Sequence, residues 1–586
     1  MRSFLKIFFA SLVALIVFSI AIFFAITIFI GSATSASKPS IGSNAVLVLD
    51  LNQAFAEQAK NNPLNTFFDN PSANIPGLYD MVRLIRYAKG DSSIKGIYIK
   101  AGDNENAYAA SEELRQALAD FKKSKKFIIA YGNVIPERAY YVAMLADKIY
   151  CNPAGGVEWN GFAIDMLFMK GLLDKLDIQP EIFYAGKFKS ATEPLRATEM
   201  TDANRLQTTV WLNDIYDNLL MRTAEARNTD TATLHQLANN GTIQTAKDAV
   251  KYNLIDGVKY DDEVKAEISK RLNKDSKEDI NFVSFGKYAK AVDFQKSGSD
   301  GKIDIIYAQG DIVDGKGEKE EIGSDDFVKI IRKARLDNDV DAIVFRVNSP
   351  GGSAMASEAI WREISLAKEK KPVVVSMGDY AASGGYYISC AADSVFADET
   401  TITGSIGVFS VLANLEDFFK NKLGITFDGV KTAPYADLGT ISRPLTDQEK
   451  RFMQASVDTI YNTFMTRVAD GRKKDTAYID SIAQGRVWMG KRAIGVGLVD
   501  RTGTLQDAVD CAARMAKLTN YRTREYPEQK SLLEELTDQS FTAESQQKAI
   551  VKEIGQEQYN LLQKTKKLTE IINVPQTRLP FDIDLR

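Results

Sequence analysis

An internal repeat constrains the fold of this chain more than any other feature. Residues 81–161 align without a gap on residues 327–407, a constant offset of 246, and 17 of the 81 aligned positions are identical. The identities fall in matching places, because MVRLIRYAK aligns on FVKIIRKAR and YYVAMLADKIY aligns on YYISCAADSVF. The sequence therefore predicts two copies of one domain, an N-terminal repeat at residues 44–290 and a C-terminal repeat at residues 300–525.

Each copy alternates helical segments with short β-branched runs. In the second copy the run DAIVFRVN is followed by a glycine turn, the helical segment SEAIWREISLAKEK and a second run, PVVVSM. This alternation predicts an α/β fold with right-handed crossovers and a largely parallel sheet. Ligands bind at the loops that follow the carboxyl ends of such strands. In the second copy these loops are NSPGGS and GDYAASGGYY.

The amino terminus differs in character from the rest. Residues 7–30 carry no charge, and their length is enough to cross a bilayer as one helix. A cleaved signal peptide is the alternative, since the following GSATSAS could be a processing site, but the apolar run is longer than a usual signal core. We expect an uncleaved transmembrane anchor. Arg2 and Lys6 predict that residues 1–6 are a cytoplasmic stub and that everything after about residue 31 lies across the membrane.

The carboxyl terminus is also distinct. Residues 526–586 are rich in Glu, Gln and Lys with spaced Leu and Ile, and they end in a proline-containing tail. This composition predicts a peripheral helical extension.

Composition excludes several classes of function. The net charge is -4, so there is no basic excess with which to neutralise the phosphates of a nucleic acid. The three cysteines show no CxxC spacing, and His235 is the single histidine. We therefore expect no metal, no cofactor and no nucleic-acid partner, and a mechanism with a histidine base has one candidate.

Two glycine-containing loops of the second copy carry candidate chemistry. Ser383 lies between small residues at a predicted strand-to-helix junction, where its hydroxyl could attack a carbonyl while the amide of Gly384 binds the oxyanion. An ordinary helix N-cap is the alternative for an isolated Ser-Gly-Gly. Gly351 and Gly352 follow the preceding strand, where backbone amides can approach a ligand closely. Alone they would be a simple turn, but beside Ser383 they supply the second oxyanion donor.

At this point the motifs resemble those of a known family. NSPGGS, GDYAASGGYYIS and TGSIGV are similar to the signal peptide peptidase A family, whose long form is also called protease IV, and the resemblance runs from the anchor to about residue 525. It implies a tandem duplication of a Clp protease/crotonase-like domain and a membrane-anchored serine endopeptidase with a Ser/Lys dyad. The implied substrates are remnant signal peptides. The resemblance also implies a homotetramer in the bacterial inner membrane, with the catalytic domains on the extracytoplasmic side.

The resemblance also assigns the remaining site residues. FYAGKFKSATEP in the first copy is similar to the base-bearing motif of the family, which makes Lys189 the general base and Lys187 the less favoured neighbour. A lysine can accept a proton if burial keeps its amine neutral. Ser405, in TITGSIGVF, corresponds to a family serine that orients the lysine, and a serine in an ordinary turn is the alternative.

The two copies divide these residues between them. At the offset of 246, the first copy has Glu137 for Ser383, Glu105 and Asn106 for the two loop glycines, and Trp159 for Ser405, whereas the second copy has Tyr435 for Lys189. Neither copy is complete. An active site therefore needs both, juxtaposed within one chain or across subunits of an oligomer.

Two other functions stay open. A crotonase-like acyl-CoA enzyme would use a similar sheet and two backbone donors. A catalytically silent membrane scaffold would have lost the serine or the glycines in both copies, whereas the second copy keeps them. The pair of Ser383 and Lys189 favours peptide hydrolysis over both.

Overall fold

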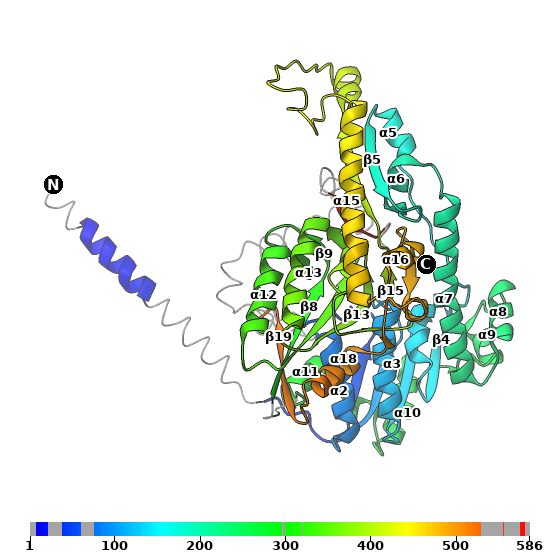
Figure 1. Ribbon diagram of the computed structural model, residues 1–586. Coiled ribbons are helices and arrows are strands. Elements are labelled where there is room, and N and C mark those ends of the chain that lie inside the picture. Colours follow the sequence, from blue (N-terminus) through cyan, green and yellow to red (C-terminus); the bar gives the residue numbers. More distant parts are fainter. Residues whose placement is uncertain are drawn as a thin grey trace.

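The computed structural model describes most of the chain (Figure 1). The described residues are 7–20, 38–59, 75–295, 298, 301–318, 320–528, 555, 559 and 575–579. Residues 7–20 form a helix, and the rest of the predicted membrane anchor, residues 21–30, lies outside the described part. Among the described residues, no helix is both long and apolar enough to span a bilayer.

The first repeat is built on a sheet of six parallel strands. The strand order is β6-β4-β3-β2-β1-β7, and every neighbouring pair runs parallel. The strands are β1 (Ala45–Asp50), β2 (Ile94–Lys100), β3 (Phe127–Ile135), β4 (Lys148–Val157), β6 (Gly257–Val258) and β7 (Asn281–Ser284). The helices of this repeat are α2 (Leu78–Gly90), α3 (Tyr108–Lys122), α4 (Glu137–Ala143), α5 (Lys170–Lys175), α6 (Glu193–Arg196), α7 (Asp202–Arg227), α8 (Thr231–Asn239), α9 (Ala246–Lys251), α10 (Asp261–Arg271) and α11 (Phe285–Ala291).

The second repeat is built on an eight-stranded sheet of the same kind. Its main path is β17-β15-β13-β11-β8-β19. β14 pairs with β13, β18 pairs with β14, and only β15 and β17 pair antiparallel. The strands are β8 (Gly301–Gln309), β11 (Ala342–Ser349), β13 (Val373–Ala382), β14 (Ser394–Ala397), β15 (Ile402–Gly404), β17 (Val487–Met489), β18 (Arg501–Thr502) and β19 (Tyr521–Tyr526). The helices are α12 (Ser324–Leu336), α13 (Ala354–Lys368), α14 (Gly384–Tyr387), α15 (Asp447–Arg472), α16 (Thr476–Ile482), α17 (Gly490–Gly495) and α18 (Leu505–Met515).

The two repeats share local structure as well as order. The long helices α7 and α15 both have 26 residues and begin after a threonine N-cap, Thr201 and Thr446. Each threonine side chain accepts a backbone N–H three residues further on, which satisfies one of the free donors of the first turn. Both helices end at a residue in the left-handed conformation. The predicted α/β architecture with parallel sheets is therefore confirmed in both copies.

A third sheet joins the two repeats. Its order is β10-β9-β12-β20-β16-β5, and its strands are β5 (Gln179–Ala185), β9 (Asp311–Val313), β10 (Glu321–Gly323), β12 (Gly351–Ser353), β16 (Val408–Asn414) and β20 (Gln576–Arg578). β5 belongs to the first repeat and pairs antiparallel with β16 of the second along seven residues. In Figure 1, β5 lies beside the long helix α15 of the second repeat. Backbone hydrogen bonds thus fix a segment of one copy onto the other.

Apolar packing also crosses between the repeats. One core cluster is formed mainly by residues of the first repeat, but it includes Ala382, Ile402, Val487 and Met489 of the second. These four residues come from β13, β15 and β17, the strands that surround Ser383. A second cluster fills most of the second repeat and includes Phe183 and Ala185 of β5 from the first. The relative position of the two copies is therefore set by a shared interior next to the candidate site.

Candidate active site

Ser383 lies at the junction between a strand and a helix, as the sequence predicts. β13 ends at Ala382 and α14 begins at Gly384. Ser383 has φ 55° and ψ -115°, a conformation that costs a non-glycine residue about 1–3 kcal/mol and persists only when its surroundings hold it. The surroundings do so here, because the Ser383 N–H donates to the Gly404 carbonyl at 2.7 Å and the Ser383 carbonyl accepts the Tyr387 N–H at 2.8 Å.

Lys189 reaches this serine from the other repeat. β5 ends at Ala185, which pairs with Val408 of β16, so the loop that follows β5 is carried onto the second repeat. The Phe188 N–H then donates to the Gln484 carbonyl at 2.8 Å. Gly485 lies so close to Lys189 that an added Cβ would be 2.6 Å from the lysine backbone nitrogen. The loop is thus held by backbone contacts on both of its sides.

The amine of Lys189 has three oxygen neighbours. Its Nζ lies 2.8 Å from Ser383 Oγ, 3.2 Å from Ser405 Oγ and 3.2 Å from the Ser405 carbonyl. Lys189 is 1% exposed, and both serines are 0% exposed. Burial holds the pKa of the Lys189 amine well below its usual value, because desolvation penalises the ammonium form. A neutral amine has two N–H groups and one lone pair, which matches these three neighbours in number.

The predicted oxyanion glycines lie beside Ser383. Gly351 has φ 106°, a region that side chains rarely adopt, and a Cβ added to it would lie 2.8 Å from the backbone nitrogen of Gly384. Gly352 lies against β9, where an added Cβ would be 2.0 Å from the Ile312 carbonyl oxygen. The structure therefore brings the backbones of Gly351 and Gly384 together, and it places Gly352 against β9.

A strand from the carboxyl-terminal extension lies in this site. β20 pairs antiparallel with β12, so that Thr577 lies opposite Gly352 and Arg578 opposite Gly351. A Cβ added to Gly351 would lie 2.0 Å from the Thr577 carbonyl oxygen. The sequence predicts a peripheral helical extension here, whereas residues 576–578 are extended and the Thr577 side chain is buried. The edge of β12 explains the difference, since it offers backbone groups that an extended segment satisfies. Most of the extension lies outside the described residues.

The corresponding positions of the first repeat form no such constellation. The Glu137 carboxylate accepts the N–H groups of Asn160 and Gly161 at 2.7 and 2.9 Å, and burial raises the pKa of this carboxyl. Trp159 is fully buried and donates its Nε1–H to the Leu234 carbonyl at 2.9 Å. His235 lies on α8, where its ring contacts Tyr216. Lys189, and not the single histidine, is the potential base that lies next to Ser383.

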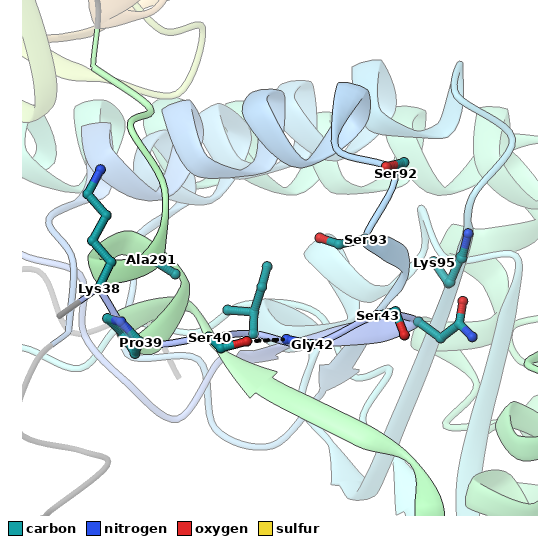
Figure 2. A pocket seen from close by; sticks show the side chains of 11 residues that line it. Lys38, Pro39, Ser40, Gly42, Ser43, Ser92, Ser93, Lys95 and Ala291 are labelled. Atoms are coloured by element: carbon teal, nitrogen blue, oxygen red, sulfur yellow. Dashed lines mark hydrogen bonds between the residues drawn. The ribbon is translucent and has the colours of Figure 1, made fainter.

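A polar hollow lies elsewhere on the first repeat (Figure 2). Lysines and serines from two chain segments surround it, and within it the Gly42 N–H donates to Ser40 Oγ at 3.3 Å. Its lining residues are Lys38, Pro39, Ser40, Ile41, Gly42, Ser43, Asn44, Ser92, Ser93, Lys95 and Ala291. None of these residues belongs to the group around Ser383, so the hollow is separate from the candidate active site.

Sequence reasoning missed two contributors to the site. The pairing of β5 with β16, which delivers Lys189, joins residues more than 200 positions apart. The insertion of β20 joins residues separated by a similar distance. A weak signal was available for β5, since EIFYA is a short run rich in β-forming residues. Nothing in the sequence singles out QTR as a strand.

Comparison with known proteins identifies relatives along most of the chain. The model of peptidase family S49 matches twice, at residues 120–275 and 365–519. Protease 4 of Salmonella typhi is 38% identical over 472 residues, which cover 79% of this chain and 75% of that protein. The chloroplastic serine protease SPPA of Arabidopsis thaliana is 31% identical over 485 residues, which cover 82% of this chain and 70% of that protein.

A solved structure also matches part of the chain. The 1510-N membrane-bound stomatin-specific protease, in complex with a substrate peptide, is 16% identical, with a TM-score of 0.27. The match covers 41% of this chain and 96% of that one. The family assignment rests on the sequence relatives.

Proposed function

Because this chain is a serine peptidase that belongs to peptidase family S49, we propose that Ser383 is its nucleophile and Lys189 its general base. The observation that carries this proposal is the distance of 2.8 Å between Lys189 Nζ and Ser383 Oγ in a buried site. Serine at neutral pH is a poor nucleophile and needs a neighbour that accepts its proton. The buried Lys189 amine, whose pKa is held low, is the group placed to do this.

Ser405 orients the amine in this mechanism. The two N–H groups of neutral Lys189 donate to the side chain and the carbonyl of Ser405, both at 3.2 Å. The lone pair then faces Ser383 Oγ and accepts its O–H. Ser383 attacks the peptide carbonyl as Lys189 takes the proton, and Lys189 later gives a proton to the leaving amine and activates a water for deacylation.

Backbone amides near Gly351, Gly352 and Gly384 are the proposed oxyanion donors. The support is the closeness of the Gly351 and Gly384 backbones. In the structure the Gly351 N–H donates to Ser349 Oγ at 3.2 Å, so it would have to exchange this partner for the oxyanion. In the structure, the Thr577 carbonyl oxygen occupies a place beside both Gly351 and Gly384, at 2.0 Å and 3.0 Å from Cβ atoms added to them. A carbonyl of an extended backbone therefore fits there, which supports a peptide as the substrate.

We further propose remnant signal peptides as substrates. The support is the likeness of NSPGGS, GDYAASGGYYIS and TGSIGV to the signal peptide peptidase A family. The uncharged run of residues 7–30 supports a single-pass anchor in a bacterial inner membrane, with the repeats on the extracytoplasmic side. An anchored site close to the bilayer would have membrane-bound peptides at high effective concentration. A homotetramer is proposed on the same family likeness.

The decisive experiment uses a fluorophosphonate label and a synthetic signal peptide in detergent micelles. We expect one label per chain, on Ser383, and cleavage of the peptide by the wild-type protein. The Ser383→Ala variant should neither take up the label nor cleave the peptide. A label on another residue, or undiminished cleavage by Ser383→Ala, would overturn the proposal.

A further inference from the structure

We propose that Gln207 of the first repeat is a positioning residue. It fixes the loop of Lys189 against β17, a strand of the second repeat that lies beside the backbone of Ser383 and Ser405. This inference rests on the proposed function. Gln207 lies on α7 and is 2% exposed. Its Nε2 donates to the Phe188 carbonyl at 3.0 Å and to Ser190 Oγ at 3.1 Å, so it binds the residues on both sides of Lys189.

The other end of the same amide binds the second repeat. Gln207 Oε1 accepts the Val487 N–H at 3.2 Å. Val487 begins β17 and pairs with Gly404 of β15. The Gly404 carbonyl accepts the Ser383 N–H at 2.7 Å, and the Arg486 carbonyl, one residue before Val487, accepts the Ser405 N–H at 2.7 Å. One side chain therefore connects the loop of the base with the backbone that fixes both serines.

The contacts require an amide. An amide has two N–H groups and one carbonyl, and all three are used here. A carboxylate would place a second acceptor against the Phe188 carbonyl, and an apolar side chain would leave the buried Val487 N–H without this acceptor. The geometry at this position therefore depends on the chemistry of the side chain as well as on its volume.

A buried polar network holds the amide in place. Asn204 Oδ1 lies 3.4 Å from Gln207 Nε2 and accepts the Thr208 hydroxyl at 3.3 Å. Asn204 Nδ2 donates to the Glu193 carboxylate at 2.8 Å, and the same carboxylate accepts the Thr201 hydroxyl at 2.6 Å. Asn204 and Glu193 are both buried. The network is satisfied on each member, which limits the orientations that Gln207 can take.

The second repeat provides an internal comparison for this assignment. The N-caps of α15 and α7, Thr446 and Thr201, lie 245 positions apart. When the two helices are aligned on these N-caps, Gln207 corresponds to Phe452. Phe452 is 40% exposed and contacts the ring of Tyr435 at a centroid distance of 5.1 Å. Tyr435 is the counterpart of Lys189. Where the base is absent, the glutamine is absent too, and an aromatic pair takes the place of the contact between loop and helix.

The test compares two variants. Gln207→Met keeps the volume of the side chain and loses its hydrogen bonds. The control is Gln448→Met, at a partly exposed glutamine on the equivalent helix α15. A small misplacement of a catalytic group can cost about 100-fold in rate. For Gln207→Met we expect kcat to fall by about 10- to 100-fold on this principle, with KM unchanged. Gln448→Met should match the wild type in both constants.

A second variant, Gln207→Glu, keeps the inference testable if Gln207→Met does not fold. A carboxylate near the Lys189 loop favours the ammonium form, so the rising limb of the pH profile of kcat/KM should move up by about one pH unit. A purely structural residue would lower thermal stability without moving this limb. Wild-type kcat for Gln207→Met, or an unmoved limb in a folded Gln207→Glu, would overturn the inference. If Ser383→Ala and Lys189→Ala kept full turnover, the proposed function itself would fail instead.

Discussion

The two repeats keep the same supporting contacts and differ in the groups around the site. Tyr140 donates its hydroxyl to the Leu254 carbonyl at 2.6 Å, and its counterpart Tyr386 donates to the Leu498 carbonyl at 2.9 Å. The pair of Arg227 and Asp256 in the first repeat likewise recurs as Arg472 and Asp500 in the second. The framework is thus repeated down to individual hydrogen bonds.

The positions of the candidate chemistry show the opposite behaviour. Ser383 with its strained backbone corresponds to Glu137, whose carboxylate is bound by two backbone amides. Lys189, buried, corresponds to Tyr435, which is 46% exposed. The comparison teaches that a duplicated domain can retain its packing while the positions of the candidate chemistry take structural roles in one copy. Because the candidate residues come from both copies, they meet where the third sheet joins the two copies.

The strongest test of this division removes one group from each copy. Ser383→Ala and Lys189→Ala should each lower kcat/KM for a peptide substrate by at least about 10⁴-fold, because nucleophile and base act as a unit. Glu137→Ala and Tyr435→Ala, at the counterpart positions, should retain the wild-type rate within about twofold, a size typical of residues outside the reacting unit. Steady-state kinetics of the four variants measures these changes in kcat/KM. A large loss in Glu137→Ala would show that the first copy has chemistry of its own.

The glycine loop offers a second contrast. In Gly351→Ala the new Cβ would lie 2.0 Å from the Thr577 carbonyl oxygen and 2.8 Å from the Gly384 nitrogen, at a φ of 106°. We expect a loss in kcat of about 100-fold, the usual effect of one oxyanion donor. Glu105→Ala, at the corresponding exposed position of the first repeat, should change nothing measurable. If kcat of Gly351→Ala equalled that of the wild type, the glycine loop would have no part in binding the oxyanion.

The pH dependence tests the state of Lys189. The amine must be neutral to accept a proton, so activity is lost as pH falls through its pKa and is complete above it. Burial lowers this pKa, so the rising limb of kcat/KM should lie well below the value of about 10.4 for an exposed lysine. Below the limb, the rate should change about tenfold per pH unit. A limb near the value for an exposed lysine would contradict the burial of the base.

The tail strand provides the smallest expected effect. β20 occupies the edge of β12, so a peptide that pairs there must displace it. A chain that ends at residue 574 should therefore show kcat/KM raised by about threefold to tenfold. In this chain β20 no longer has to leave the edge of β12 before a peptide can pair there. A chain that ends at residue 579 keeps β20 and is the control. Lower activity in the shorter chain would mean that β20 completes the working site.

Local sequence predicts which residues meet at the candidate site better than it predicts how they are brought there. Short motifs point to Ser383, their resemblance to a family points to Lys189 and Ser405, and the structure brings these three residues together. The backbone strain at Ser383 was not predicted, because it follows from contacts with Gly404 of a later strand. The position of Gln207 was equally hidden, since a glutamine in a helix has no signature until its partners from β17 are known.

The fold likewise has a part that the sequence predicts and a part that it does not. The parallel sheets follow from alternating strands and helices, whose signals are local. The third sheet could not be predicted, because its strands come from both copies and from the carboxyl-terminal tail. Such pairing depends on which edges are left open once the two cores have formed.

The most direct test of the account asks whether both halves of the site come from one chain. Chains with Ser383→Ala are mixed with chains with Lys189→Ala under conditions that allow subunits to exchange, and peptide hydrolysis is measured. The structure has the amine and the hydroxyl 2.8 Å apart within a single chain, so the mixture should stay as inactive as either variant alone. Activity regained on mixing would contradict this account, because it would mean that Lys189 of one subunit acts on Ser383 of another.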